Sequence, residues 1–233
     1  MDYTLEDEVK APKPFKIFGK IVKWVFISFV ILMILWFGIC GIFQKGTSKV
    51  KKYIWTEETA QLYKQNGKLD IWKLTAYNKP NENMELTEKL FFIDNLTYTT
   101  ETSQFQFMLR YNILNEEIKK FVSKSDSENP FVFVLKDNKG NTYTEYQYIE
   151  DSALIYGYYR IVFSNIDIKK ASELSLYVYC NSGDDIKQSS FVDICVVWYT
   201  DGYKEEYKLS SSEKKAQDKD IELKSFNTPL ISK

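Results

Sequence analysis

The chain has 233 residues, with 31 basic and 32 acidic side chains and a formal net charge of −1. This balance gives no field that attracts nucleic acid, and only Arg110 and Arg160 carry the guanidinium fork that reads phosphates and bases. The chain contains no histidine, the commonest general base and metal ligand. We therefore expect no nucleic-acid partner, no catalytic residues, no cofactor and no metal site.

Residues 1–23 are charged and contain two prolines, which predicts an unstructured cytoplasmic arm. Residues 24–43 follow as twenty positions without one charged side chain. A helix rises about 1.5 Å per residue, so this run matches the roughly 30 Å hydrocarbon core of a bilayer. A cleaved signal peptide has a shorter apolar core and small residues at its cleavage site, whereas Gln44 and Lys45 follow this run. The run predicts an uncleaved signal-anchor, with the membrane lipid bilayer as the first partner.

The orientation of this span is weakly marked in the sequence. Five lysines precede the span and four follow it, so the positive-inside rule alone barely decides. The early position of the span and the long downstream part, rich in Tyr, Thr and Ser, favour a cytoplasmic N-terminus. The expected location is the cell membrane, crossed once, with an extracytoplasmic C-terminal domain.

Residues 44–67 are expected to form a juxtamembrane linker and a short helix. The first ten of them are basic and suit anionic head groups. Within 56–66, a threonine start, two acids in the first turn and Gly67 as the stop predict the helix.

Residues 68–209 have a hydrophobic period of two, which is typical of half-buried strands. The side chains of Phe105 and Phe107, for example, fall on one face of their run, and those of Gln104 and Gln106 fall on the other. A tight hairpin is expected at residues 201–202, between the last two strands. The expected strands are 68–77, 90–98, 103–111, 131–136, 142–149, 154–163, 174–180, 191–199 and 203–209.

This pattern of short strands and turns, with a second short helix near 115–121, predicts a mainly β domain. The expected fold is a single N-terminal transmembrane helix followed by an antiparallel Ig-like β-sandwich over 68–209. The polar, Lys-rich residues 210–233 predict a flexible tail.

Two runs between Phe131 and Tyr179 carry a resemblance, FVFVLKDNKGNTY and YYRIVFSNIDIKKASELSLYVY. They are similar to Ig-like sandwiches of membrane-anchored extracytoplasmic proteins of low-GC Gram-positive bacteria. In those proteins a strand ending in D-x-x-G-N-x-Y precedes one that closes on an F-x-N-[IV]-D turn and then S-L-x-L-Y. The resemblance implies a topology and a location, and no catalytic residue carries over from it.

The three cysteines give no secure disulfide. Cys40 lies in the span, where it reads as a small apolar side chain. Cys180 and Cys195 lie in neighbouring predicted strands, and their parity places them on different faces. A disulfide across a bulged register and two unpaired thiols both stay open.

A row of tyrosines is the candidate binding surface. Tyr146, Tyr148, Tyr156 and Tyr158 share the predicted outward parity of two successive strands, near Arg160. Exposed tyrosines stack on sugars or anchor a protein partner. The alternative is that these rings line a second sheet face that helices or loops cover.

Three hypotheses about function follow from this reading. The first is a non-catalytic interaction module that binds an envelope protein or itself. The second is a cell-wall or glycan-binding module that uses the tyrosine row. The third is a cell-envelope enzyme, which the missing histidine and the absence of any recognisable catalytic motif disfavour.

Overall fold

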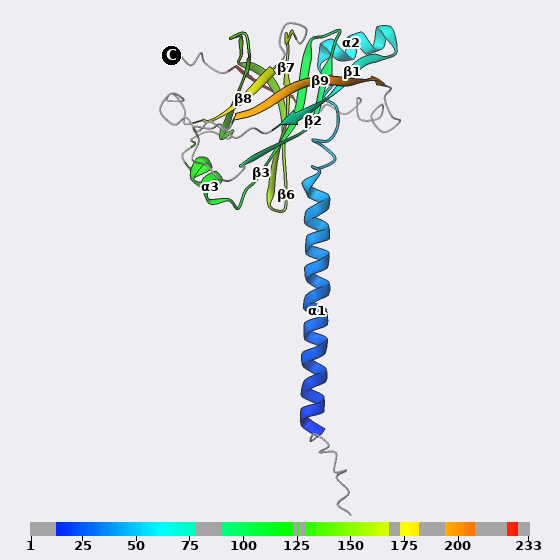
Figure 1. Cartoon of the computed structure of the whole chain (residues 1–233), viewed down its shortest axis with the longest axis vertical. Coiled ribbons are helices and arrows are strands. Elements are labelled where there is room, and N and C mark those ends of the chain that lie inside the picture. The colour runs from blue at the N-terminus through cyan, green and yellow to red at the C-terminus, as the bar shows by residue number, and fades with distance from the viewer. Residues whose placement is uncertain are drawn as a thin grey trace, which may run out of the picture. The chain divides into compact units, whose positions relative to one another are not determined.

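A computed structural model of the protein describes residues 13–77, 90–123, 125, 129–167, 173–181, 194–207 and 223–227. The chain forms two compact units, Met1–Ile42 and Phe43–Lys233. The first unit holds most of α1 (Lys13–Gln44), an uninterrupted helix of 32 residues (Figure 1). Its stretch from Phe18 to Gln44 is long and apolar enough to cross a membrane, by length and composition.

The helix α1 starts well before the expected span. It begins at Lys13 rather than at residue 24, so part of the expected cytoplasmic arm is helical. Pro14 is compatible with this start because the first helical turn has no intrahelical acceptor for the missing N–H. The predicted apolar helix is present and extends further toward the N-terminus than its uncharged core.

The second unit is mainly β, as predicted, and its described strands form one ten-stranded antiparallel sheet (Figure 1). The order across the sheet is β10-β6-β7-β3-β2-β1-β9-β8-β4-β5. The strands and the two short helices of this unit are β1 (Leu69–Tyr77), β2 (Phe91–Thr99), β3 (Gln104–Asn112), β4 (Phe131–Asp137), β5 (Thr142–Tyr143), β6 (Glu145–Ala153), β7 (Tyr156–Phe163), β8 (Glu173–Cys180), β9 (Ile194–Tyr207), β10 (Lys224–Asn227), α2 (Glu57–Asn66) and α3 (Glu116–Ser123).

The C-terminal part differs from expectation in two places. Strand β9 runs through residues 201–202, where a tight hairpin was expected. Both halves of β9 pair antiparallel with β1 across an irregularity in the register, so the chain keeps its direction instead of reversing. Residues 224–227, expected within a flexible tail, pair with β6 as the edge strand β10.

The sheet is rolled so that its two halves face each other across one core. Phe131 and Phe133 of β4 contact the ring of Tyr159 in β7, with centroids 6.0 and 5.1 Å apart, although these strands lie far apart in the strand order. Phe226 of β10 packs against the main core and also against the cluster that contains Val132, on the other face of β4. Strands β10 and β4, which lie near opposite ends of the strand order, therefore approach each other in space.

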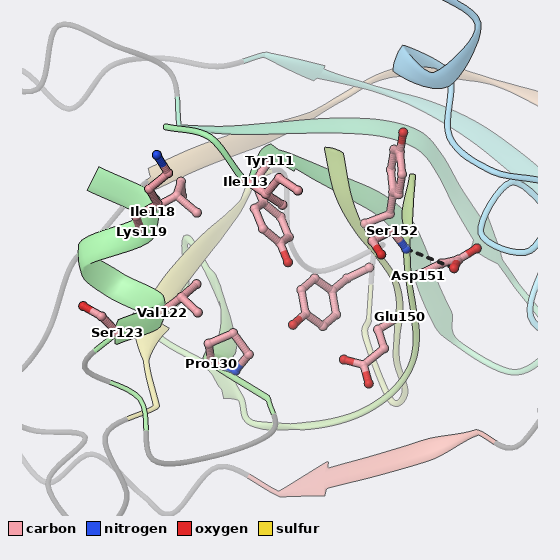
Figure 2. Close-up of a pocket in the computed structure, with 12 residues that line it drawn as sticks. Tyr111, Ile113, Ile118, Lys119, Val122, Ser123, Pro130, Glu150, Asp151 and Ser152 are labelled. Carbon is pink, nitrogen blue, oxygen red and sulfur yellow. Dashed lines mark hydrogen bonds between the residues drawn. The ribbon is translucent and has the colours of Figure 1, made fainter. Parts of the chain in front are cut away.

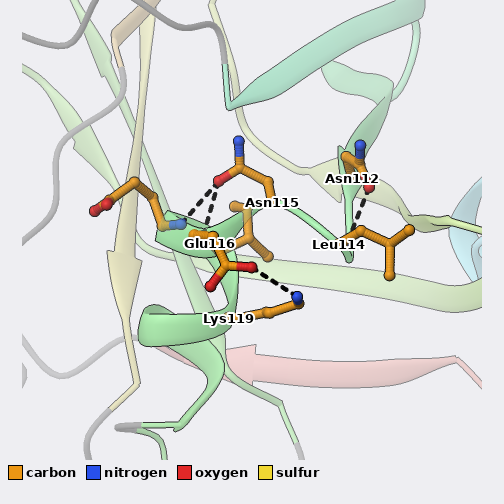
Figure 3. A network of polar contacts seen from close by, with 7 residues as sticks. Asn112, Leu114, Asn115, Glu116 and Lys119 are labelled. Carbon is orange, nitrogen blue, oxygen red and sulfur yellow. Dashed lines mark hydrogen bonds and ion pairs between the residues drawn. The ribbon is translucent and has the colours of Figure 1, made fainter.

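Both short helices are capped, and the caps of α2 are those that its sequence predicts. The Thr56 hydroxyl accepts from the Thr59 N–H at 3.2 Å at the start of α2, and Gly67, with φ of +70°, ends it by donating to the Tyr63 carbonyl at 2.8 Å. The start of α3 is held by Asn115, whose Oδ1 accepts from the second and third N–H groups after it at 2.9 and 3.3 Å (Figure 3). These bonds satisfy donors that a helix leaves unpaired and fix α3 at the end of β3.

The backbone register bears on the question of a disulfide. Cys195 of β9 pairs with Leu176 of β8, and Cys180 lies four residues further along β8. Four residues of a strand span about 13 Å, whereas bonded cysteines need Cα atoms within about 7 Å. In this backbone register, positions 180 and 195 lie further apart than the Cα atoms of a disulfide.

Candidate functional site

Residues 43–56, called the strap from here on, cover the outer face of β3, β7 and β6. Val50 and Ile54 of the strap are buried and pack in one cluster with Met108 of β3, Val162 of β7 and Ile149 of β6. Each such side chain contributes about 1.5 to 3 kcal/mol when it is fully buried. The segment expected to be a juxtamembrane linker is therefore part of the folded domain.

A glutamine of β3 binds the strap as a neighbouring strand would. The Oε1 of Gln106 accepts from the Ile54 N–H at 3.0 Å, and its Nε2 donates to the Ile54 carbonyl at 2.9 Å. Gln106 is fully buried, and Arg160 donates to the same Oε1 at 3.4 Å. Because a buried backbone group without a partner costs about 1 to 3 kcal/mol, this pairing holds the strap in one register.

The end of the strap is tied to α2 and to β2. The Oε1 of Gln104 accepts from the hydroxyls of Thr56 and Thr59 at 3.1 and 2.7 Å. The hydroxyls of Tyr53 and Thr99 share a hydrogen bond, and burial raises the pKa of Tyr53 to about 12. The whole segment from the end of α1 to the start of α2 is thus fastened to the sheet.

The beginning of the strap is bound as firmly as its end. The Tyr158 hydroxyl donates to the carbonyl of Phe43, and the Thr47 hydroxyl donates to Oδ2 of Asp151 at 2.6 Å. Phe43 is also the last residue of the apolar run 24–43. The second unit therefore begins at the residue where the apolar run ends.

Two of the expected row of tyrosines face the core. Tyr146 and Tyr148 are 4% and 5% exposed and belong to the main hydrophobic cluster. They pair across the β6–β7 hairpin with Phe163 and Ile161, and cross-strand partners share one face of a sheet. Because those partners point inward, the tyrosines do too, and their expected outward parity is wrong. Burial raises the pKa of Tyr146 well above its usual value.

The other expected site residues lie on the outer face, and the strap covers two of them. Tyr158 and Arg160 are 0% and 2% exposed, whereas Tyr156 is partly exposed. Arg160 donates to the carbonyl of Asn95 at 2.8 Å and to the hydroxyl of Thr97 at 3.3 Å. Burial raises the pKa of Tyr158 to about 12. The five residues do not form one exposed row, and the interpretation that a covering segment hides them fits Tyr158 and Arg160.

A cavity of about 690 Å³ opens between α3 and the ends of β3, β6 and β7 (Figure 2). Its wall is mainly apolar and aromatic, with Ile118 and Val122 from α3, Tyr111 and Tyr159 from the strands, and Pro130. Ligand pockets measure roughly 300 to 1,000 Å³ and have walls of this kind. We call this space the α3 cavity.

A glycine shapes the aromatic wall of the α3 cavity. Tyr111 pairs across the sheet with Gly157, and a Cβ at Gly157 would lie 2.2 Å from the Tyr111 ring. The Tyr111 ring stacks on that of Tyr159 with centroids 6.1 Å apart, and the Tyr159 hydroxyl donates to Asn129 Oδ1 at 2.9 Å. Burial, and then the charge of Glu150, raises the pKa of Tyr111 to about 12. The rings are thus neutral donors held in fixed positions.

The acidic side of the α3 cavity is held from two directions. The carboxylate of Glu150 pairs with Lys224 of β10, and its backbone carbonyl accepts from Lys49 of the strap at 3.0 Å. Asp151 accepts from the N–H of Ser152 at 3.0 Å with one oxygen (Figure 2), and its other oxygen is bound by the strap. This edge of the cavity is therefore ordered by the same segment that joins the domain to the span.

A second hollow of about 690 Å³ lies between α2 and the β6–β10 edge. Its lining includes the carboxylates of Glu57, Glu58 and Glu145 and the amides of Gln104 and Gln147. Such a wall is well solvated by water, so the α3 cavity is the better candidate for an apolar ligand.

Comparison of the chain with protein-family models, with curated proteins and with solved structures found no match. The α3 cavity was not predicted from the sequence. One signal for it is the spacing of Ile118 and Val122, four residues apart on a short helix that also carries two glutamates and two lysines. The aromatic wall of the cavity also depends on the pairing of Tyr111 with Gly157. That pairing is set by the register between β3 and β7, which the sequence of either strand alone does not show.

Proposed function

We propose that this chain is a single-pass membrane protein whose β domain is a non-catalytic binding module, with the α3 cavity as its binding site. The observation that carries the proposal is the aromatic and apolar wall of that cavity, built on fixed strand ends. A cavity with such a wall binds an apolar group by removing it from water. The partner we propose is an envelope protein, or a second copy of this chain, that inserts an apolar side chain.

The placement of the domain outside the cell belongs to the same proposal. The near balance of lysines around the span leaves orientation to the Tyr-, Thr- and Ser-rich composition of the downstream part and to the resemblance to extracytoplasmic Ig-like proteins. The two facing halves of the rolled sheet are compatible with a relationship to the two layers of an Ig-like sandwich. An extracytoplasmic domain on a membrane anchor suits a protein that holds a partner at the membrane surface.

The glycan hypothesis draws little support from the tyrosine row. Tyr146, Tyr148 and Tyr158 have almost no exposed surface, so their rings are not available for stacking on a sugar at the surface. Tyr111, which is partly exposed and lines the α3 cavity, lies outside that row. We therefore favour a protein partner over a polysaccharide.

The test is photo-crosslinking in intact membranes with the full chain. The photoreactive residue p-benzoylphenylalanine replaces Val122, which lines the cavity, or Lys120, which is exposed on the same helix and does not line it. A discrete adduct from position 122 that position 120 does not form supports the proposal. The adduct should weaken when Gly157→Ala displaces the Tyr111 ring. Equal adducts from both positions, or none from position 122, would contradict a binding site in the cavity.

A further inference from the structure

The β6–β7 hairpin ends in an exposed leucine in an unfavourable backbone conformation. Leu154 and the next residue form a two-residue loop between Ala153 and Tyr156, which pair with each other. Leu154 has φ of +54°, a region that favours glycine, and its side chain is 44% exposed. The first position of such a hairpin loop is normally glycine when its φ is positive. Strained residues cluster at functional sites, so an exposed apolar side chain in such a position points to a function.

Three more side chains form a chain of contacts that begins at Tyr156, at the base of this loop. The Arg110 guanidinium lies 4.7 Å from the ring centroid of Phe92 and 5.1 Å from that of Tyr156. Phe92 is itself 38% exposed. We call Phe92, Arg110, Leu154 and Tyr156 the interfacial patch. Apolar side chains, aromatic rings and an arginine together are the composition of membrane–water interfaces.

The interfacial patch lies beside the residue at which the span ends. Gln44 directly follows the apolar run 24–43, and its Nε2 donates to the Tyr156 hydroxyl at 3.2 Å. If the run fills the hydrocarbon core, Gln44 lies in the head-group layer, which is about 5 to 8 Å thick on each side. The contacts from Gln44 to Tyr156 and from Tyr156 to Arg110 connect the patch to this residue.

From this juxtaposition we propose that the interfacial patch rests in the head-group layer of the membrane that α1 spans, with Leu154 reaching toward the acyl chains. The occupant is the lipid bilayer. The guanidinium of Arg110 and the ammonium of Lys45, beside the end of the span, complement lipid phosphates. Insertion removes the exposed leucine from water, which accounts for an apolar side chain in this loop. The inference does not depend on what the α3 cavity binds.

The experiment places an environment-sensitive fluorescent amino acid at position 154 of the full chain, which is reconstituted in phosphatidylcholine vesicles. The control carries the same residue in place of Lys139, an exposed position in the β4–β5 turn. That turn lies away from the patch, because β4 begins beside Tyr111 and runs about 20 Å before it reaches the turn. The quencher is a phospholipid with a nitroxide near the top of its acyl chain.

We expect the nitroxide lipid to reduce emission from position 154 at least about twofold and to leave the control nearly unchanged, as for side chains buried at an acyl boundary. Equal emission with and without the nitroxide lipid at position 154 would overturn the proposal. Emission that shifts with the protein-to-lipid ratio but not with the quencher would also overturn it, because another protein molecule would then cover the hairpin. Quenching at both positions would overturn it as well, since the tip would have no special depth.

Discussion

The attachment of the strap can be tested at Gln106, because its buried side-chain amide hydrogen-bonds to both the N–H and the carbonyl of Ile54. Gln106→Leu keeps the volume nearly constant and removes these two hydrogen bonds and one acceptor of Arg160. Each buried group left without its partner costs about 1 to 3 kcal/mol, and the more apolar side chain returns roughly 1 to 2 kcal/mol. We expect a net loss of about 3 kcal/mol in the free energy of unfolding.

The assay is thermal unfolding of the full chain in mild detergent, followed by tryptophan fluorescence. Trp55 lies in the strap and packs against Tyr53 and Tyr63, so it reports on this segment. For a domain of about 190 residues, a loss of 3 kcal/mol corresponds to a fall in Tm of about 6 to 12 °C. Trypsin should also cut the variant faster at the strap lysines under native conditions, because a loosened strap exposes its backbone.

Two further variants make the strap result interpretable. Gln61→Leu is the matched control, because Gln61 is exposed on α2 and makes its one described bond to Glu57 at 3.2 Å. Its effect should stay within about 0.5 kcal/mol. Gln106→Glu keeps the acceptor for the Ile54 N–H and loses the donor to the Ile54 carbonyl. Its cost in the free energy of unfolding should therefore fall between the costs of Gln61→Leu and Gln106→Leu. If Gln106→Leu proves no more destabilising than Gln61→Leu, the strap does not depend on this amide and the reasoning fails.

Three other predictions concern single positions. Gly157→Ala should destabilise the fold by about 1 to 3 kcal/mol in urea unfolding through overpacking against Tyr111, and an unchanged midpoint would show that the ring moves freely. Leu154→Gly should leave the domain as stable or stabilise it by about 1 kcal/mol in detergent, since it relieves the positive φ, and a lower Tm would contradict that account. Burial alone raises the pKa of Asp137, but hydrogen bonds from Asn141, Lys139 and Tyr143 outweigh it and lower this pKa. Its stabilising contribution is therefore complete above the unfolded value near 4 and is lost as pH falls through the folded value. Asp137→Asn should flatten the acid limb of the stability–pH curve, and an unchanged limb would refute this.

Local chemistry predicted the elements of this fold better than their faces. The uncharged run predicts the apolar helix, and Thr56 and Gly67 mark α2 because capping is decided within a few residues. The inward direction of Phe105 and Phe107 follows from alternation in one strand. Tyr146 alternates equally well in either parity, and only its pairing with Phe163 decides which face it takes. Register between strands is a tertiary property, so a period of two cannot supply it.

The strap and β9 differ from what their local sequences predict, for a related reason. Val50 and Ile54 stand among lysines, so the local composition indicates a head-group linker, and their burial depends on the outer face of strands far along the chain. Asp201 and Gly202 have the composition of a tight turn, yet the residues on both sides pair with β1. In both places a partner distant in sequence outweighs the local signal. The α3 cavity was missed because its wall combines α3 with three strand ends.

The strap and the α3 cavity share two side chains. Tyr158 lines the cavity and donates to the carbonyl of Phe43, and Asp151 lines it and accepts from Thr47. A ligand that displaces either side chain must alter a bond that holds the strap, so occupancy of the cavity and attachment of the strap are energetically coupled. Coupling of this kind is reciprocal. If a bound ligand changes the equilibrium constant for attachment of the strap by some factor, detachment of the strap changes the affinity for that ligand by the same factor.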